Sequence, residues 1–156
     1  SIVYAGLHGI AQGLDQILNA AKIIENQNPD VQFIFIGDGP EKLKLIELKG
    51  KLKIDNVTLV PIQDSNIMPE IWASADIGII SLKKHIPGAV PSKLYEVMSS
   101  ETPIIFIGDG EAKEIVESSN CGLTLLPNDV DGIARSIEKI ITKKKSKTTK
   151  EKKKKK

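Results

Sequence analysis

Six short apolar runs alternate along the chain with segments of helical periodicity. The runs are rich in Val and Ile and mostly continuous, which is typical of strands covered on both faces. They comprise Ile2–Ala5, Val31–Ile36, Val57–Val60, Ile77–Ser81, Ile104–Ile107 and Leu123–Leu126. Strands that alternate with helices favour a parallel sheet with right-handed crossovers. The sequence therefore predicts an α/β fold with a doubly wound, mostly parallel, Rossmann-like sheet of about six strands.

The intervening segments carry apolar residues at three- and four-residue steps, as expected of helices with one buried face. The first expected helix carries an apolar stripe that begins at Leu14. The other expected helices cover Glu41–Lys53, Ile67–Ala75, Ser92–Ser100, Ala112–Ser118 and Val130–Thr142. These elements define one domain over residues 1–142. Trp72 and Cys121 are expected to be core residues.

The charge of the chain is divided unevenly between this domain and the remaining residues. Residues 143–156 hold 10 of the 22 basic residues and one of the 20 acidic ones, which leaves 12 basic and 19 acidic residues in 1–142. An acidic body with 4% aromatic residues does not favour nucleic-acid binding. The Lys-rich end is of low complexity, so we expect a disordered tail that either does nothing specific or is attracted to anionic lipid.

Two further features concern the compartment. Cys121 is the only cysteine, so an internal disulfide is excluded, and this suits a reducing compartment. No apolar run approaches the roughly 20 residues of a membrane span. We expect a cytoplasmic protein, with peripheral contact at the inner face of the membrane if the basic end binds lipid.

Glycines follow the first two predicted strands. Gly6, Gly9 and Gly13 miss the spacing of the dinucleotide fingerprint, but glycines there let backbone N–H groups approach a phosphate. A tight turn without a ligand explains them equally well, and His8 between them is expected to be exposed. The second loop, Gly37–Pro40, reads as a turn into a helix in which Asp38 either caps the helix or contacts a ligand.

The stretch after the fourth predicted strand is the most informative. On a helix that begins near Pro91, Ser92, Tyr95, Glu96 and Ser99 fall on one side, whereas Leu94, Val97 and Met98 fall on the other. Helix N–H groups and Lys93 can hold a diphosphate, and the Glu96 carboxylate can accept two ribose hydroxyl hydrogen bonds. A solvated Lys93–Glu96 surface pair remains the alternative.

The segment from Pro91 to Met98, followed by Thr102–Ile105, resembles the P-S-K-x-x-E-x-M-x-x-x-x-P-V block of retaining glycosyltransferases of family 4, the glycosyl transferases group 1. Tyr4–Gly6, Gly13–Asp15 and Phe35–Pro40 occupy the matching earlier positions, and the resemblance covers residues 1–142. It implies the C-terminal, donor-binding half of a two-domain GT-B enzyme. The likeness is greatest to bacterial enzymes that add N-acetylated amino sugars to surface polysaccharides.

The resemblance also implies roles for individual residues. Glu96 would bind the ribose, and the segment near Ile62 would meet the nucleobase. The residues implied to surround the diphosphate and the rest of the donor are Gly9, Gln12, Gly37, Asp38, Gly39, Ser92, Lys93 and Leu94. Many relatives have an Arg and a Lys where this chain has Leu7 or His8 and Gln12, and a second glutamate where it has Gly88. Backbone amides must then hold more of the diphosphate.

These features predict transfer of a hexosyl or N-acetylhexosaminyl group from a nucleotide sugar, with UDP as the expected nucleotide. No cofactor beyond the donor is implied, and no metal, because the sequence has no Asp-x-Asp pair to bridge a diphosphate to a divalent ion. The acceptor site and the catalytic residues would lie in an N-terminal partner domain, without which this domain would be inactive. Two alternatives stay open. One is a sugar-nucleotide epimerase domain, for which the sequence offers few acid–base residues, namely His8, His85 and scattered carboxylates. The other is a non-catalytic α/β nucleotide-binding module.

Overall fold

The computed structural model describes residues 1–82 and 92–154. Within them the chain forms strands and helices in regular alternation. The strands are β1 (Ile2–Ala5), β2 (Phe33–Ile36), β3 (Val57–Val60), β4 (Ile77–Ser81), β5 (Ile104–Ile107) and β6 (Gly122–Leu125). A short 3-10 helix, η1 (Ile10–Gln12), is followed by the α-helices α1 (Leu14–Gln27), α2 (Lys42–Leu52), α3 (Met68–Ser74), α4 (Ser92–Ser99), α5 (Glu111–Ser119) and α6 (Val130–Lys154).

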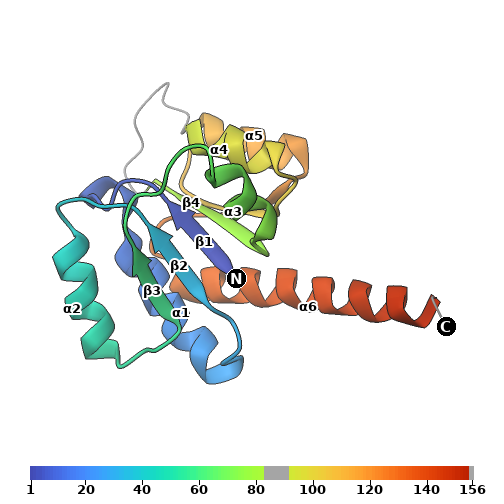
Figure 1. The fold of residues 1–156 in the computed structure, drawn as a ribbon, viewed down its shortest axis with the longest axis horizontal. Coiled ribbons are helices and arrows are strands. Elements are labelled where there is room, and N and C mark those ends of the chain that lie inside the picture. Colours follow the sequence, from blue (N-terminus) through green and yellow to red (C-terminus); the bar gives the residue numbers. More distant parts are fainter. Residues whose placement is uncertain (83–91, 155–156) are drawn as a thin grey trace.

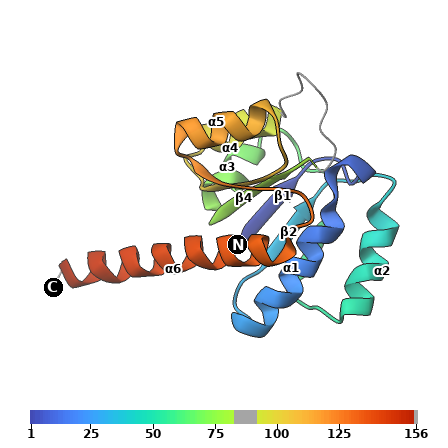
Figure 2. The same ribbon diagram turned by 180° about the vertical axis from the view of Figure 1, so that it is seen from behind.

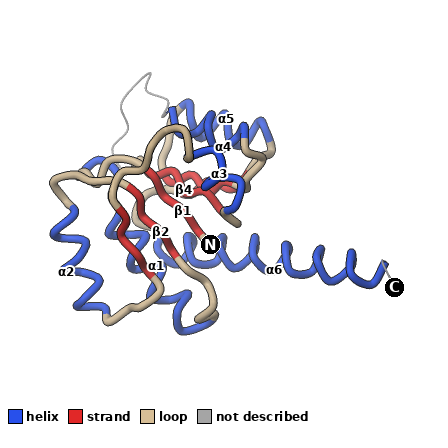
Figure 3. The backbone as a smooth tube through the Cα atoms, in the orientation of Figure 1, coloured by secondary structure: helices blue, strands red, loops and turns tan. Residues whose placement is uncertain are grey.

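The described strands form one parallel sheet in the order β3-β2-β1-β4-β5-β6. The helices lie on both sides of it (Figures 1 and 3). The predicted α/β fold with a six-stranded, doubly wound sheet is therefore confirmed. Each expected strand and helix is present, and most boundaries differ from the expected ones by no more than two residues.

Alternate residues of the strands supply two hydrophobic cores. Ile2, Tyr4 and Phe35 point to the face covered by α1, α2 and α6, which Figure 2 shows from behind. Val3, Phe106 and their neighbours pack against α3, α4 and α5 on the other face. Because a strand buried on both faces has no polar side to show, the runs in the sequence are continuous. Trp72 is buried in the second core, and Cys121 is partly buried against it.

Helix α6 extends well beyond the body of the domain (Figure 1). The structure thereby corrects the expectation of a disordered tail for residues 143–154, which continue this helix. Ile133, Ala134 and Ile137 are buried in the first core and fix the start of α6. Further residues then extend an existing helix without the cost of nucleation, and Lys is a good helix former.

Candidate functional site

The carboxyl ends of β1 and β4 lie side by side at the centre of the sheet, where the strand order reverses. From β1 the chain proceeds to β2 and β3 on one side, and from β4 to β5 and β6 on the other. The loop after β1 leads to α1 on one face, whereas the segment after β4 leads to α4 on the opposite face. The two connections diverge here, and open α/β sheets bind ligands in the crevice that results.

Backbone hydrogen bonds join the loops that follow β1 and β2. The Gly6 N–H donates to the Ile36 carbonyl over 2.9 Å, and the His8 N–H donates to the Asp38 carbonyl over 2.9 Å. In return, the Glu41 N–H donates to the His8 carbonyl over 2.9 Å. The two glycine-containing loops therefore form one unit beside the crevice.

Two glycines make this close approach possible. A Cβ at Gly37 would lie 2.0 Å from the carbonyl oxygen of Gly6, and the Gly37 φ of +142° also disfavours any other residue. At Gly39, a Cβ would lie 2.5 Å from the carbonyl oxygen of His8. The glycines of the second loop thus serve the junction with the first, and the Asp38 side chain accepts the N–H of Gly39 over 2.8 Å instead of capping α2.

His8 is fully buried, which corrects the expectation of an exposed histidine. The backbone of His8 is hydrogen-bonded to the second loop on both sides, so its ring is drawn beneath the junction, 6.1 Å from the ring of Tyr4. Among the residues that the structure describes, neither ring nitrogen finds a hydrogen-bond partner. Burial lowers the pKa of His8, the positive charge of Lys42 lowers it further, and the Asp38 carboxylate opposes both. The ring is thus held neutral.

The buried histidine predicts a pH dependence of stability. Since the folded pKa lies below the unfolded value of about 6.5, the unfolded chain takes up a proton first as the pH falls, and unfolding gains up to about 1.4 kcal/mol per pH unit. The stability present above pH ~6.5 is therefore lost on acidification. Urea unfolding at neutral and mildly acidic pH checks this, and His8→Phe should weaken the dependence. Identical losses in wild type and variant would show that His8 is not buried neutral.

A polar network connects the first loop with β4 and with the start of α6. The Ser81 hydroxyl at the end of β4 donates to the Gln12 carbonyl. It also accepts from Gln16 Nε2 over 3.4 Å, and Gln16 Oε1 accepts the N–H of Asn128 over 2.6 Å. These contacts fix the backbone of the loop on the crevice side. Ser81 and Gln16 are not among the residues predicted above. The available signals were a polar residue at the end of an apolar strand and a polar residue within an apolar helical stripe.

Helix α4 presents its two faces as expected. Leu94 and Val97 are fully buried, so Leu94 offers only its backbone to the crevice, whereas Ser92, Tyr95 and Glu96 are exposed. Lys93 Nζ lies 3.4 Å from Glu96 Oε2, and the two side chains are 36% and 44% exposed. A pair this exposed contributes at most about 1 kcal/mol to the fold. Both charges therefore remain accessible to a ligand.

The remaining expected site residues are brought together only in part. Gly9 and Gln12 lie in the first loop, joined to Gly37, Asp38 and Gly39 by the contacts above. Ile62 follows β3 and its side chain is 73% exposed. No hydrogen bond among the described residues connects Ser92, Lys93 or Glu96 to the glycine loops. His85 and the Pro87–Pro91 segment with Gly88 lie outside the described residues.

One cation beside the loops was not anticipated. Lys42, in the first turn of α2, donates to the Gly37 carbonyl over 3.4 Å. Its place directly after the Gly37–Glu41 turn was the available signal. Lys42 therefore supplies positive charge beside the two glycine-containing loops. In the described part of the chain, no group of three His, Cys, Asp or Glu residues is placed to hold a metal ion.

The chain matches over residues 1–156 the family model described as glycosyl transferases group 1. A comparison with curated protein sequences found no significant match. Among solved structures, a TarM variant of S. aureus in complex with Fondaparinux, alpha-GlcNAc-glycerol and UDP has a TM-score of 0.79 at 15% identity, covering 90% of this chain and 28% of TarM.

Two more solved structures have the same fold. HepE of Anabaena in complex with UDP-glucose has a TM-score of 0.79 at 19% identity, with 92% of this chain and 40% of HepE covered. The C-terminal domain of the group 1 family protein LpcC from Francisella tularensis has a TM-score of 0.73 at 21% identity, covering 90% of this chain and 75% of that one. The present chain thus spans well under half of TarM and HepE and most of the LpcC domain.

Proposed function

The chain belongs to the group 1 glycosyl transferases, and on that basis we propose that it is the donor-binding domain of a retaining enzyme. The donor is a nucleotide sugar, with UDP as the nucleotide, and the acceptor is a polysaccharide or a lipid-linked sugar. Membership in the family supports glycosyl transfer as the class of reaction. The uridine base is supported by the UDP bound to TarM and the UDP-glucose bound to HepE. Retention is supported by the resemblance of the Pro91–Met98 sequence to the block found in the retaining enzymes.

The single observation that carries the site is the reversal of the strand order between β1 and β4. At such a reversal the connections that follow the two central strands leave to opposite faces of the sheet, and the first glycine loop and α4 belong to these two connections. In this proposal, the Gly9 and Gln12 backbone and the first turn of α4, Ser92 and Lys93, hold the diphosphate. Glu96, which is exposed on α4, accepts the ribose hydroxyls, and the segment at Ile62 meets the uracil through its main chain.

A partner domain is part of the proposal. The chain covers 28% of TarM and 40% of HepE, so these enzymes contain much that this chain does not. Large apolar side chains are exposed in loops at the carboxyl edge of the sheet, namely Leu7, Ile10, Ile62 and Leu126. A neighbouring domain at this edge would cover them and would close the crevice over the donor. The acceptor site and the catalytic groups would then lie on that domain, and the present chain alone would be inactive.

The proposed enzyme works in the cytoplasm. The basic end of its chain contacts the inner face of the membrane. Among the described residues, no helix has the length together with the apolar composition that a membrane crossing requires. The proposed transferred group is a hexosyl or N-acetylhexosaminyl group, because the first loop resembles that of transferases of N-acetylated amino sugars.

The chain is expected to bind uridine diphosphate weakly, with a dissociation constant between about 10 μM and 1 mM, because one wall of the closed site is absent. Isothermal titration calorimetry measures this, with adenosine diphosphate as the control for base preference. Absence of heat with every nucleoside diphosphate at millimolar concentration would refute the assignment of the donor site. Equal affinity for both nucleotides would refute uridine as the base.

A further inference from the structure

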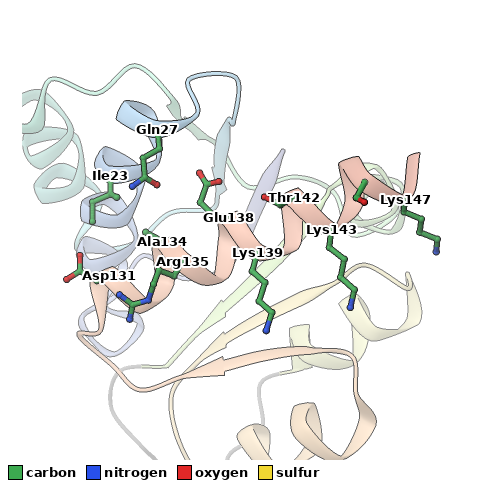
Figure 4. A pocket seen from close by; sticks show the side chains of 11 residues that line it. Ile23, Gln27, Asp131, Ala134, Arg135, Glu138, Lys139, Thr142, Lys143 and Lys147 are labelled. Atoms are coloured by element: carbon green, nitrogen blue, oxygen red, sulfur yellow. The ribbon is translucent and has the colours of Figure 1, made fainter. Parts of the chain in front are cut away.

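Helix α6 carries four basic residues that follow one another at intervals of four positions. Arg135, Lys139, Lys143 and Lys147 are all exposed, and we refer to these four residues as the cation ladder. Figure 4 shows their side chains on the same side of α6, whereas Glu138 points away from them. Residues four apart lie about 6 Å from one another along a helix. The ladder is therefore a row of four closely spaced positive charges.

The ladder is not neutralised by the protein itself. None of its four residues makes a salt bridge within the part of the chain that the structure describes. Between Glu138 and Glu151 the sequence contains no acidic residue. Positive charges placed side by side repel one another and destabilise an isolated helix. This cost is offset when an anionic partner binds the row.

The body of the domain holds the ladder in a fixed orientation. Ile133, Ala134 and Ile137 anchor the first turns of α6 in the hydrophobic core. Farther along, Lys144 donates to Asp76 over 2.6 Å, next to the start of β4. Although burial raises the pKa of Asp76, the hydrogen bond from Lys144 helps to hold it below its usual value, so this link is charged. Binding a partner therefore requires little ordering of the helix.

The ladder lies at the end of the sheet opposite to the glycine loops. A groove of about 820 Å³ separates it from the turns that precede β5 and β6, and Lys139, Lys143 and Lys147 line that groove together with Ser119–Gly122. A second groove, of about 950 Å³, lies between α6 and α1 and is lined by all four ladder residues together with the carboxylates Asp131 and Glu138 (Figure 4). A partner bound along α6 would thus leave the carboxyl edge open to donor and acceptor.

The chemistry of the surrounding sequence indicates which partner fits. After Ile141 no apolar residue follows, so this part of the helix cannot insert into hydrocarbon and can bind only by charge. Residues 1–142 hold 12 basic and 19 acidic residues and therefore form a negatively charged body. An anionic surface repels this body and attracts the basic end of the chain, which orients the protein. A planar anionic surface accommodates this separation of charge, whereas a nucleic acid would need basic and aromatic residues on the body.

We propose that the cation ladder docks the protein on the anionic phospholipid headgroups of a membrane. This extends the membrane contact of the proposed function to four particular residues. It does not depend on the transfer reaction. The contact is electrostatic, so it weakens as salt shortens the Debye length from about 10 Å at 0.1 M to about 3 Å at 1 M.

The test is co-sedimentation of the 156-residue chain with vesicles of phosphatidylcholine that contain about one third phosphatidylglycerol, a composition with a strongly negative surface potential. The variant carries Arg135→Gln, Lys139→Gln, Lys143→Gln and Lys147→Gln, which remove the charges and keep good helix formers. A matched control removes four charges from other helices, with Lys44→Gln, Lys49→Gln, Lys51→Gln and Lys113→Gln.

The ladder variant is expected to bind at least tenfold more weakly than the wild type, since each basic residue near an anionic surface contributes measurably to binding. The control variant should bind as the wild type does, and pure phosphatidylcholine should bind neither. Equal losses in the two variants would show a nonspecific effect of net charge and overturn the proposal, as would tighter binding of the wild type to single-stranded RNA than to the vesicles. Calorimetry with uridine diphosphate should give the same affinity for all three proteins. This measurement distinguishes a failure of the proposed donor site from a failure of the proposed membrane contact.

Discussion

Replacement of Gly37 by alanine is expected to lower the free energy of unfolding by about 3 kcal/mol or more, because the new Cβ cannot be accommodated. It would lie 2.0 Å from the carbonyl oxygen of Gly6, and the Gly37 φ of +142° is one that L-residues rarely adopt. The opposing atom belongs to the backbone, so no side-chain rotation can relieve the clash. The two loops would have to separate, with loss of the hydrogen bonds that join them. Urea unfolding followed by circular dichroism measures the change.

Gly50→Ala is the matched control for this substitution. Gly50 lies in α2, and a Cβ there meets no atom within 4 Å. In a helix interior, alanine is more favourable than glycine by about 0.5–1 kcal/mol, so this variant should be more stable than the wild type. Opposite signs for the two substitutions are expected. If both variants unfolded at the urea concentration of the wild type, the junction between the loops would not have the geometry described above.

Replacement of Glu96 by alanine is expected to weaken the binding of uridine diphosphate at least tenfold. A carboxylate that accepts two ribose hydroxyls forms charge-assisted hydrogen bonds, each worth about 1.5–3 kcal/mol. The melting temperature should change little, since Glu96 is exposed and its pair with Lys93 contributes at most about 1 kcal/mol. Calorimetry and thermal unfolding of the same samples separate the two effects.

Two comparisons make the Glu96 experiment specific. Glu114→Ala removes an exposed glutamate from α5 with the same change in helix propensity, and it should leave nucleotide affinity intact. A 2′,3′-dideoxy nucleotide should bind poorly to the wild type and lose little more in Glu96→Ala, because the hydroxyls and the carboxylate form one interaction. An unchanged affinity combined with an unfolded domain would make Glu96 a structural residue.

The fold was predictable because each level of the sequence agrees with it. The runs at Phe33–Ile36 and Ile104–Ile107 are apolar without alternation, as buried parallel strands require, and helical periodicity returns between them. The buried and exposed faces of α4 were predictable from the rotation of about 100° per residue in an α-helix. The grouping of Gly9 and Gln12 with Gly37–Gly39 came from the family resemblance, and the hydrogen bonds between the two loops bring these residues together.

The errors arose where tertiary contacts decide the outcome. His8 is a loop residue by sequence, but hydrogen bonds between the backbones of two loops bury its ring, and such contacts leave no local pattern. Ser81 lies at the end of an apolar strand and Gln16 lies within an apolar helical stripe. Their role depends on a hydrogen bond between them and on the contact of Gln16 with Asn128, more than one hundred residues away in the sequence. A Lys-rich segment builds no core, and on that ground the sequence predicts disorder at the end of α6. In the structure this segment continues a helix that the core already anchors.

The most direct measurement of the central claim is a titration of the ¹⁵N-labelled chain with uridine diphosphate, followed by two-dimensional NMR. The claim is that the nucleotide binds in the crevice between the first glycine loop and α4. It predicts saturable shifts of the backbone amides of Gly9, Gln12, Ser92, Lys93 and Glu96, with little change along α6. Shifts that cluster between Ala134 and Lys147 instead, or no shifts at millimolar nucleotide, would contradict it.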